Sequence, residues 1–178
     1  RPTKAGDWIL AHGTGGVSIA ALQFAKVLGA KVAITSSCDA KLARAASLGA
    51  DACINYKQTP DWAAEVRKAV GGAHIANVID TVGAIQFDDN ASLLQNDGQL
   101  SAIGMLGSDF SWSKTNANVT IAPIGVGNRE QHEAMTQFIV EHQIRPVVDT
   151  VYDLDRLADA YRHLESGKFF GKIGINLL

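Results

Sequence analysis

The chain has 178 residues, of which 47% are hydrophobic and 19% are charged, and its formal net charge is −2. This length and composition suit one globular domain with an apolar core, or one domain with an extension. The small net charge provides no basic surface for nucleic acid, and the apolar runs are shorter than the roughly 18 residues that a membrane span requires. We therefore expect neither nucleic acid nor a membrane as a partner.

The two cysteines and the start of the chain bear on where the protein works and how complete the sequence is. Cys38 and Cys53 lie in a helix-start pattern and a strand pattern. We expect both to be small buried side chains in a reduced, cytoplasmic protein. The chain begins at Arg1 rather than at methionine, so we expect it to be an excerpt of a longer protein.

Strands and helices alternate from the N-terminus. The patterns predict a strand over 8–11, a helix over 17–28, a strand over 31–35, a helix from residue 39 and a strand over 52–55. Gly29 and Gly49 follow the two helices, where a left-handed residue commonly ends a helix. The strands are short, apolar and β-branched, which is typical of a parallel sheet covered by helices on both faces.

The alternation continues through the rest of the chain. Further predicted elements are a helix over 60–70, a strand over 77–81, a helix over 87–94, strands over 98–104 and 119–124, a helix over 130–142, an extended piece around 146–148, a helix over 154–165 and a strand over 172–177. The predicted fold class is α/β, a Rossmann-type doubly wound parallel sheet of about six strands with helices on both faces. We assign residues 1–127 to this domain and residues 128–178 to a C-terminal segment of helices and a strand.

A glycine-rich turn lies between the first strand and the first helix. It reads Gly13-Thr14-Gly15-Gly16-Val17-Ser18. In the dinucleotide fingerprint the first glycine makes the tight turn, the second admits the pyrophosphate, and the third lets helix and strand pack closely. Gly13 and Gly15 fill the first two places and Ser18 takes the third. Because a helix N-terminus presents free N–H groups and partial positive charge, the turn predicts a pyrophosphate site. A purely structural turn is the alternative.

The end of the second strand bears on which dinucleotide binds. An acid there favours NAD(H), whereas small polar and basic residues accommodate the 2′-phosphate of NADP(H). Here Ser36 and Ser37 supply hydroxyls, and Lys41 lies one turn into the next helix. Asp39 is the one carboxylate nearby, and we expect it to be the N-cap of that helix. The sequence therefore favours NADP(H) over NAD(H).

No catalyst is visible in the sequence. Short-chain dehydrogenases use a tyrosine followed four residues later by a lysine, but here the tyrosines are followed at that spacing by Pro60, Arg156 and Glu165. Zinc sites need closely spaced Cys and His ligands, and the two cysteines and five scattered histidines do not match one. We predict no catalytic residue and no metal ligand in this chain.

Several motifs together resemble one family across essentially the whole chain. They are Gly6-Asp7-Trp8-Ile9-Leu10, the glycine turn, Gln23-Phe24-Ala25-Lys26, Thr35-Ser36-Ser37, Lys41-Leu42, Leu48-Gly49-Ala50-Asp51, Ile54-Asn55-Tyr56, Thr59-Pro60-Asp61-Trp62, Asp80-Thr81-Val82-Gly83, Ile103-Gly104, Gly125-Val126-Gly127-Asn128-Arg129 and Phe170-Gly171-Lys172. The set resembles the cofactor-binding domain and C-terminal segment of the zinc-type alcohol dehydrogenase or quinone oxidoreductase superfamily, the medium-chain dehydrogenases/reductases.

The resemblance implies a set of cofactor-binding residues. The pyrophosphate would be held by Gly13, Thr14, Gly15, Gly16 and Val17, and the 2′-phosphate by Ser36, Ser37 and Lys41 with Tyr56 close by. Thr81 and Val82 would flank the cleft, Ile103, Gly104 and Met105 would line the nicotinamide ribose, and Lys172 would reach the cofactor, with an exposed strand position as its alternative.

The resemblance also implies what this chain lacks. In that family a separate, mostly N-terminal barrel-like domain supplies the catalytic residues and, where present, the zinc, and residues 128–178 would pack partly against it. The whole enzyme would transfer hydride between nicotinamide and a small-molecule carbonyl or conjugated C=C. A homodimer would form through the edge strand near Val119 to Ile124. A non-catalytic NADPH-binding or sensing module and a reductase domain of a multidomain synthase are the alternatives.

Overall fold

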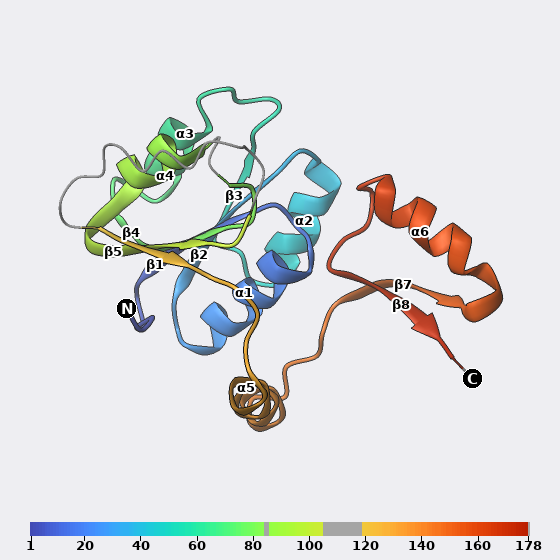
Figure 1. Cartoon of the computed structure of the whole chain (residues 1–178). Helices are drawn as coiled ribbons and strands as arrows, with labels where there is room; N and C mark the ends of the chain where they lie inside the picture. The colour runs from blue at the N-terminus through green and yellow to red at the C-terminus, as the bar shows by residue number, and fades with distance from the viewer. Residues whose placement is uncertain (84–85, 105–118, 178) are drawn as a thin grey trace.

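The computed structural model describes residues 1–83, 86–104 and 119–177 and contains a six-stranded sheet and a two-stranded sheet (Figure 1). The larger sheet consists of β1 (Trp8–His12), β2 (Lys31–Ser36), β3 (Ala52–Asn55), β4 (Ile75–Asp80), β5 (Leu94–Ala102) and β6 (Thr120–Pro123). Its helices are α1 (Gly16–Val27), α2 (Asp39–Ser47), α3 (Trp62–Ala69) and α4 (Phe87–Leu93), and α5 (Arg129–Glu141) follows β6. The C-terminal unit consists of β7 (Val148–Asp153), the 3₁₀ helix η2 (Leu154–Arg156), α6 (Leu157–Glu165) and β8 (Lys172–Asn176).

The order of strands in the larger sheet defines its topology. Neighbouring strands pair in parallel in the order β3-β2-β1-β4-β5-β6. The chain therefore runs outward from β1 to β3, returns to the centre at β4, and runs outward again on the other side. This order is that of a doubly wound Rossmann sheet, and its reversal point lies between β1 and β4. The predicted fold class is confirmed.

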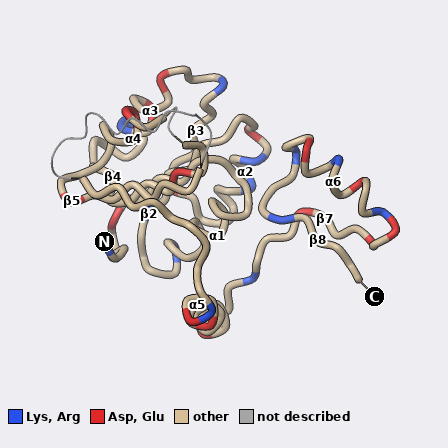
Figure 2. The backbone as a smooth tube through the Cα atoms, viewed as in Figure 1, with Lys and Arg blue, Asp and Glu red and all other residues tan. Residues whose placement is uncertain are grey.

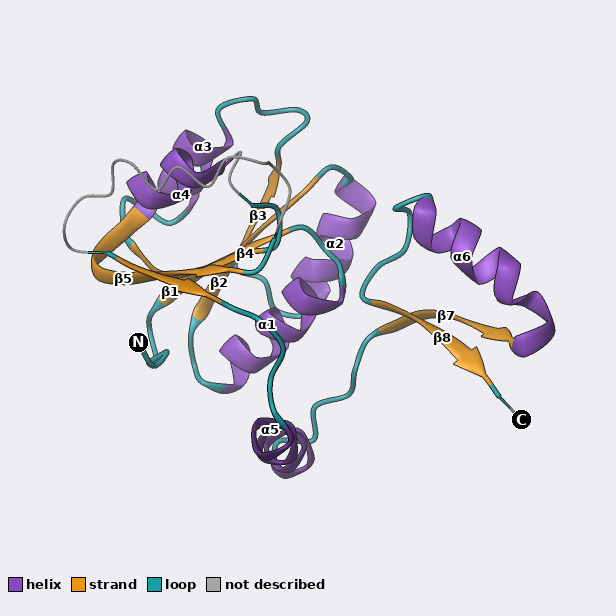
Figure 3. Cartoon of the chain, in the orientation of Figure 1, coloured by secondary structure: helices purple, strands orange, loops and turns teal. Residues whose placement is uncertain are grey.

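Two helical layers cover the sheet (Figure 3). On one face, Ile19 and Leu22 of α1 and Leu42 of α2 are buried in one apolar cluster. On the other face, Trp62 and Val66 of α3 belong to a second cluster. Each fully buried large apolar side chain contributes about 1.5–3 kcal/mol relative to exposure, so both layers are held on the sheet by burial of apolar side chains.

Charged residues are concentrated outside the larger sheet. In Figure 2, Lys, Arg, Asp and Glu lie mainly on helices and loops, and the strands of the larger sheet are mostly without charge. This distribution is expected because an unpaired charge costs free energy when it is buried.

In the described ranges, the helices are too short or too polar to cross a membrane.

Most predicted elements are present within one or two residues. The largest differences are at β7, which continues to Asp153 where an extended piece was predicted only around 146–148, and at β5. It begins at Leu94 rather than at residue 98, and Leu94 pairs with Ile75 before an irregularity in register. Asp97 adopts a left-handed backbone with φ 63° at this irregularity. The sequence pattern detects the strand only after this bend, because Asn96, Asp97 and Gly98 favour turns.

The cysteine prediction is wrong for Cys53. Its side chain is exposed, and that of Cys38 is only partly buried. Cys53 lies on β3, which is an edge strand of the sheet, and the Cys53 thiol donates a weak hydrogen bond to the Leu42 carbonyl at 3.5 Å. An edge strand has fewer neighbours to cover alternate side chains, so an apolar strand pattern does not guarantee burial there.

The C-terminal unit is joined to the glycine turn and to the core. Its two strands pair in parallel, and the backbone of Gly171 bridges to that of Gly15. Phe170 is 1% exposed and belongs to the same apolar cluster as α1 and α2. The unit therefore packs on the larger sheet domain next to the turn.

We predict that Gly104→Ala destabilises the fold. A Cβ at residue 104 would overlap the backbone carbonyl carbons of Thr81 and Val82, so the ends of β4 and β5 would have to separate. We expect a loss of about 1–3 kcal/mol in the free energy of unfolding, measured by urea denaturation. Gly125→Ala is the control, because a Cβ there meets no heavy atom within 4 Å. Equal stability of the two variants would contradict the close approach.

Candidate functional site

The glycine turn leaves its backbone open to a ligand. Gly13 has φ +75°, a left-handed conformation that glycine adopts without steric cost. Gly15 is the N-cap of α1 with extended backbone, and no side chain caps this helix in the described structure. A Cβ at Gly13 or Gly15 would meet no heavy atom within 4 Å. The space over the turn and the uncapped N–H groups fit a pyrophosphate.

Lys172 adds a positive charge beside this turn. Its side chain crosses Gly16 so closely that a Cβ on Gly16 would overlap the Lys172 Cε and Nζ atoms. Its position is held by the preceding residue, because the Gly171 N–H donates to the Thr14 carbonyl at 2.9 Å. Gly171 has φ +74°, and a Cβ there would lie 2.5 Å from the Val147 carbonyl oxygen. The C-terminal strand therefore brings an ammonium group to the N-terminus of α1.

The carbonyl of His12 connects the turn to the neighbouring strand. It accepts hydrogen bonds from the Ser18 hydroxyl at 2.5 Å and from the Thr81 hydroxyl at 2.8 Å. Ser18, in the place of the third glycine, thus holds α1 to the end of β1 through a hydrogen bond. Thr81 holds the end of β4 to the same atom. The two strand ends that flank the reversal point are therefore joined.

Asp80 joins the ends of β4 and β5 through hydrogen bonds. The Asp80 carboxylate accepts hydrogen bonds from the N–H groups of Val82 and Gly83, and the Asp80 carbonyl accepts from those of Ile103 and Gly104, all at 2.9 Å. Four predicted site residues, Thr81, Val82, Ile103 and Gly104, therefore lie together at the ends of β4 and β5. Met105 lies outside the described residues.

The strand-end hydroxyls lie at the end of β2 beside the loop after β3. Ser36 is buried and Ser37 is partly exposed, and the Tyr56 N–H donates to the Ser36 carbonyl at 3.1 Å. Lys41 projects from the first turn of α2, and its ammonium group donates to the Gly167 carbonyl of the C-terminal unit. The structure thus groups Ser36, Ser37 and Tyr56, and it connects Lys41 to residues far along the chain.

The predicted role of Asp39 as helix N-cap is wrong. Cys38 occupies the N-cap and Asp39 is the first residue of α2. The Asp39 carboxylate accepts hydrogen bonds from the side-chain amides of Asn55 at 2.6 Å and Gln58 at 2.7 Å. These hydrogen bonds hold the pKa of Asp39 below its usual value. Local helix preferences missed these partners because both lie in and after β3.

His12 is a buried polar residue to which the sequence patterns assigned no role. Its ring is 1% exposed, with Nδ1 3.1 Å from the Thr35 hydroxyl and Nε2 2.7 Å from the Asn90 side-chain oxygen. The ring also lies edge-on to Trp62. Burial lowers the pKa of His12, against the opposing effects of Asn90 and the Asp80 charge. No spacing in the sequence connects these residues, which come from five separate helices and strands.

Metal-ligand candidates are not grouped in the described ranges: no three His, Cys, Asp or Glu side chains there lie close enough together to hold a metal ion. Two of these residues have other partners: His12 contacts Thr35 and Asn90, and Cys53 donates to the Leu42 carbonyl.

The fold and the open turn define a dinucleotide-binding α/β domain. Residues 16–141 match the family described as zinc-binding dehydrogenase, and the chain belongs to this family. It corresponds to the cofactor-binding domain of the alcohol dehydrogenase and quinone oxidoreductase superfamily. A zinc-type alcohol dehydrogenase-like protein of Schizosaccharomyces pombe is 37% identical over 98% of this chain and 53% of its own length.

Two solved structures share the arrangement. An NAD-dependent alcohol dehydrogenase superposes with a TM-score of 0.84 at 32% identity, covering 99% of this chain and 52% of that chain. Escherichia coli quinone oxidoreductase complexed with NADPH superposes with a TM-score of 0.82 at 25% identity, covering 98% of this chain and 58% of that chain. The chain spans about half the length of the curated relatives that it matches.

We predict that His12 makes stability depend on pH. Its folded pKa is lowered from 6.5, so folding favours the neutral ring. The stabilisation is complete above about pH 6.5 and is lost as pH falls below it, at no more than about 1.4 kcal/mol per pH unit. Urea denaturation between pH 7.5 and pH 5 should show this decline, and His12→Gln should reduce its slope. An unchanged slope in the variant would contradict the assignment.

Proposed function

We propose that this chain binds NADPH and forms the cofactor-holding part of an oxidoreductase. The observation that carries the proposal is the open glycine turn at the reversal point between β1 and β4. Dinucleotides bind in doubly wound sheets at the carboxyl ends of the strands beside such a point. The uncapped N-terminus of α1 and the Lys172 ammonium favour a pyrophosphate at Gly13, Thr14, Gly15, Gly16 and Val17.

The preference for NADPH rests on the residues around the end of β2. Ser36, Ser37 and Lys41 offer hydroxyl and ammonium donors to a 2′-phosphate, with Tyr56 beside them. A carboxylate at this place would instead favour a ribose 2′-hydroxyl. The Asp39 carboxylate already accepts hydrogen bonds from Asn55 and Gln58, which leaves it fewer acceptor sites for a ribose. The related structures include an NAD-dependent enzyme as well as an NADPH complex, so relatives alone do not decide between the two.

In the proposed reaction the cofactor, when bound, supplies or accepts hydride at its nicotinamide ring. The residues of this chain hold and orient it. Thr81, Val82, Ile103 and Gly104 would line the nicotinamide side, where the hydrogen bonds of Asp80 keep the strand ends together. The substrate would be a small molecule with a carbonyl or a conjugated C=C.

The rest of the proposed enzyme lies outside this chain. Because the chain spans about half of its relatives, we assign catalytic residues and any zinc to a further domain, against which residues 128–178 would partly pack. β6 is an edge strand of the sheet, which is the position required for a homodimer through Val119 to Ile124. We also propose that the protein is cytoplasmic.

Calorimetry tests the choice of cofactor. We expect NADPH to bind at least about tenfold more tightly than NADH, because the 2′-phosphate gains charge-assisted hydrogen bonds. Equal affinities, or tighter binding of NADH, would overturn the NADPH assignment. Titrations at two salt concentrations supply a control, since binding of the extra phosphate charge weakens more at high ionic strength.

Gly15→Val tests the phosphate site. The side chain would fill the open space over the turn, so we expect NADPH binding to weaken at least about tenfold. The fold should persist with a loss of about 1 kcal/mol, since Gly15 is a helix cap with extended backbone and a Cβ there meets no heavy atom within 4 Å. Gly125→Val is the matched control, with open space but no place in the turn. Wild-type affinity in Gly15→Val would exclude the turn as the phosphate site.

A further inference from the structure

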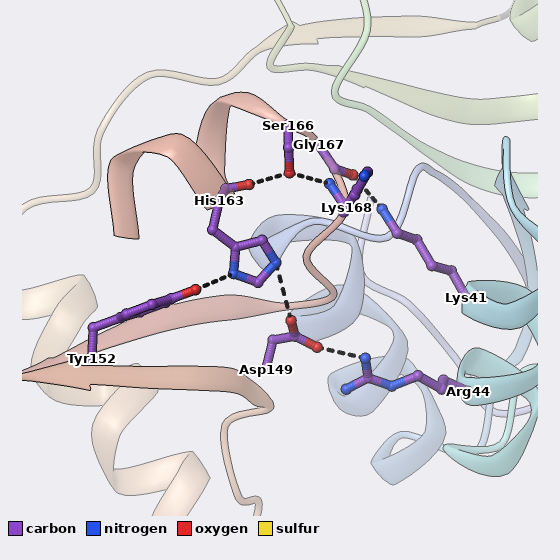
Figure 4. Close-up of polar contacts among 8 residues, drawn as sticks. All are labelled: Lys41, Arg44, Asp149, Tyr152, His163, Ser166, Gly167 and Lys168. Atoms are coloured by element: carbon purple, nitrogen blue, oxygen red, sulfur yellow. Dashed lines mark hydrogen bonds and ion pairs between the residues drawn. The ribbon is translucent and has the colours of Figure 1, made fainter. Parts of the chain in front are cut away.

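The turn that follows α6 lies against Lys41 (Figure 4). The Lys41 ammonium donates to the Gly167 carbonyl and lies 5.9 Å from the centre of the Phe169 ring. Gly167 has φ +63°, and its N–H donates to the Leu164 carbonyl at 3.1 Å. The left-handed glycine ends α6 and directs its own carbonyl outward toward α2. The partner of Lys41 is therefore a fixed part of the backbone.

The Ser166 hydroxyl stabilises this turn through two hydrogen bonds to the backbone. The Ser166 hydroxyl donates to the His163 carbonyl at 2.6 Å and accepts from the Lys168 N–H at 3.2 Å. Carbonyls at the C-terminal end of a helix carry partial negative charge, which favours a nearby ammonium group. The turn after α6 thus offers Lys41 an acceptor, a favourable dipole and an aromatic face at once.

An ion pair joins β7 of the C-terminal unit to α2. Arg44 lies one helical turn after Lys41, and its guanidinium is 2.5 Å from the Asp149 carboxylate on β7. The other Asp149 oxygen lies 3.7 Å from His163 Nε2, and His163 Nδ1 lies 3.2 Å from the Tyr152 hydroxyl. Figure 4 shows these side chains as a continuous series from α2 to α6.

The ion pair is partly protected from solvent. The Asp149 side chain is 13% exposed, and the Arg44 guanidinium lies 4.3 Å from the centre of the buried Phe170 ring. The Arg44 side chain is 48% exposed, so protection comes mainly from the Asp149 side, and such a pair is screened less by salt than a fully exposed one. Arg44 and Asp149 therefore fix how the C-terminal unit sits on α2, and with it where Gly167 meets Lys41.

We propose that the turn after α6 determines cofactor selectivity by holding Lys41 ready for the adenosine 2′-phosphate, with Arg44 and Asp149 as positioning residues. This inference rests on the proposed function. An ammonium group has three N–H donors, and the Gly167 carbonyl uses one, so two remain for phosphate oxygens. A lysine already held in place loses less conformational freedom when the phosphate binds. NADH carries no 2′-phosphate and gains nothing from this arrangement.

Fragments of the cofactor isolate this end of the site. Adenosine 2′,5′-bisphosphate carries the 2′-phosphate, and 5′-AMP is the same nucleotide without it. Both are titrated into the full chain, together with NADPH and NADH. The variants are Asp149→Asn, which removes the ion pair at nearly constant volume, and Phe169→Leu, which removes the aromatic face from Lys41. Arg162→Gln is the matched control, because Arg162 pairs with Asp159 on α6 itself.

We expect Asp149→Asn and Phe169→Leu each to weaken binding of NADPH and the bisphosphate about two- to fivefold. Binding of NADH and 5′-AMP should stay within the error of the titration, and Arg162→Gln should change none of the four affinities. Equal weakening of all four ligands would indicate a purely structural role and overturn the proposal. Unchanged affinities in both variants would overturn it as well.

Lys41→Met separates this inference from the proposed function. If wild type discriminates NADPH from NADH and Lys41→Met loses that discrimination, the proposed function stands. In that case, unaltered selectivity in Asp149→Asn and Phe169→Leu would overturn only the role of the turn. If Lys41→Met keeps a wild-type preference for NADPH, Lys41 does not bind the 2′-phosphate and the role of the turn is overturned. If wild type shows no preference, the proposed 2′-phosphate site itself is wrong.

Discussion

The hydrogen bonds that converge on the His12 carbonyl hold the candidate site together. This one oxygen accepts from Ser18 at the start of α1 and from Thr81 at the end of β4. The two strand ends beside the reversal point are thereby held at a constant separation, and the glycine turn is fixed between them. A buried carbonyl with two donors is well satisfied. Loss of either donor would weaken the link between the ends of β1 and β4.

The C-terminal unit contributes to the same site from the opposite end of the chain. Phe170 is buried with α1 and α2, the Gly171 N–H binds the Thr14 carbonyl, and the Lys172 side chain crosses Gly16. Three consecutive residues thus supply an apolar anchor, a backbone link and a charge. The Arg44–Asp149 ion pair and the Lys41–Gly167 hydrogen bond continue this contact along α2. The unit forms one wall of the site and helps to complete it.

Much of the fold was predictable because its signals are local. Apolar periodicity, the glycine turn and the glycines that end helices each act over a few residues, and the predicted elements mostly match the structure. The errors have a common physical cause. Asp39 was expected to cap its own helix, but Asn55 and Gln58 compete for its carboxylate. Cys53 was expected in the core, but the position of β3 at the sheet edge exposes it. Both outcomes depend on neighbours that a local pattern does not contain.

Residues close together in the sequence determine the order of elements, the α/β class and the glycine turn at the start of α1. Backbone preferences and the burial of periodic apolar side chains produce these features, and both act within short segments of the chain. The environment of Lys41, the buried ring of His12 and the approach of Lys172 to Gly16 depend on tertiary contacts. Lys41 and Gly167 are 126 residues apart, and Arg44 and Asp149 are 105 apart. Such pairs come into contact only when the C-terminal unit packs on the sheet domain. The distance between two residues so far apart in the sequence is set by this packing and cannot be read from their spacing along the chain.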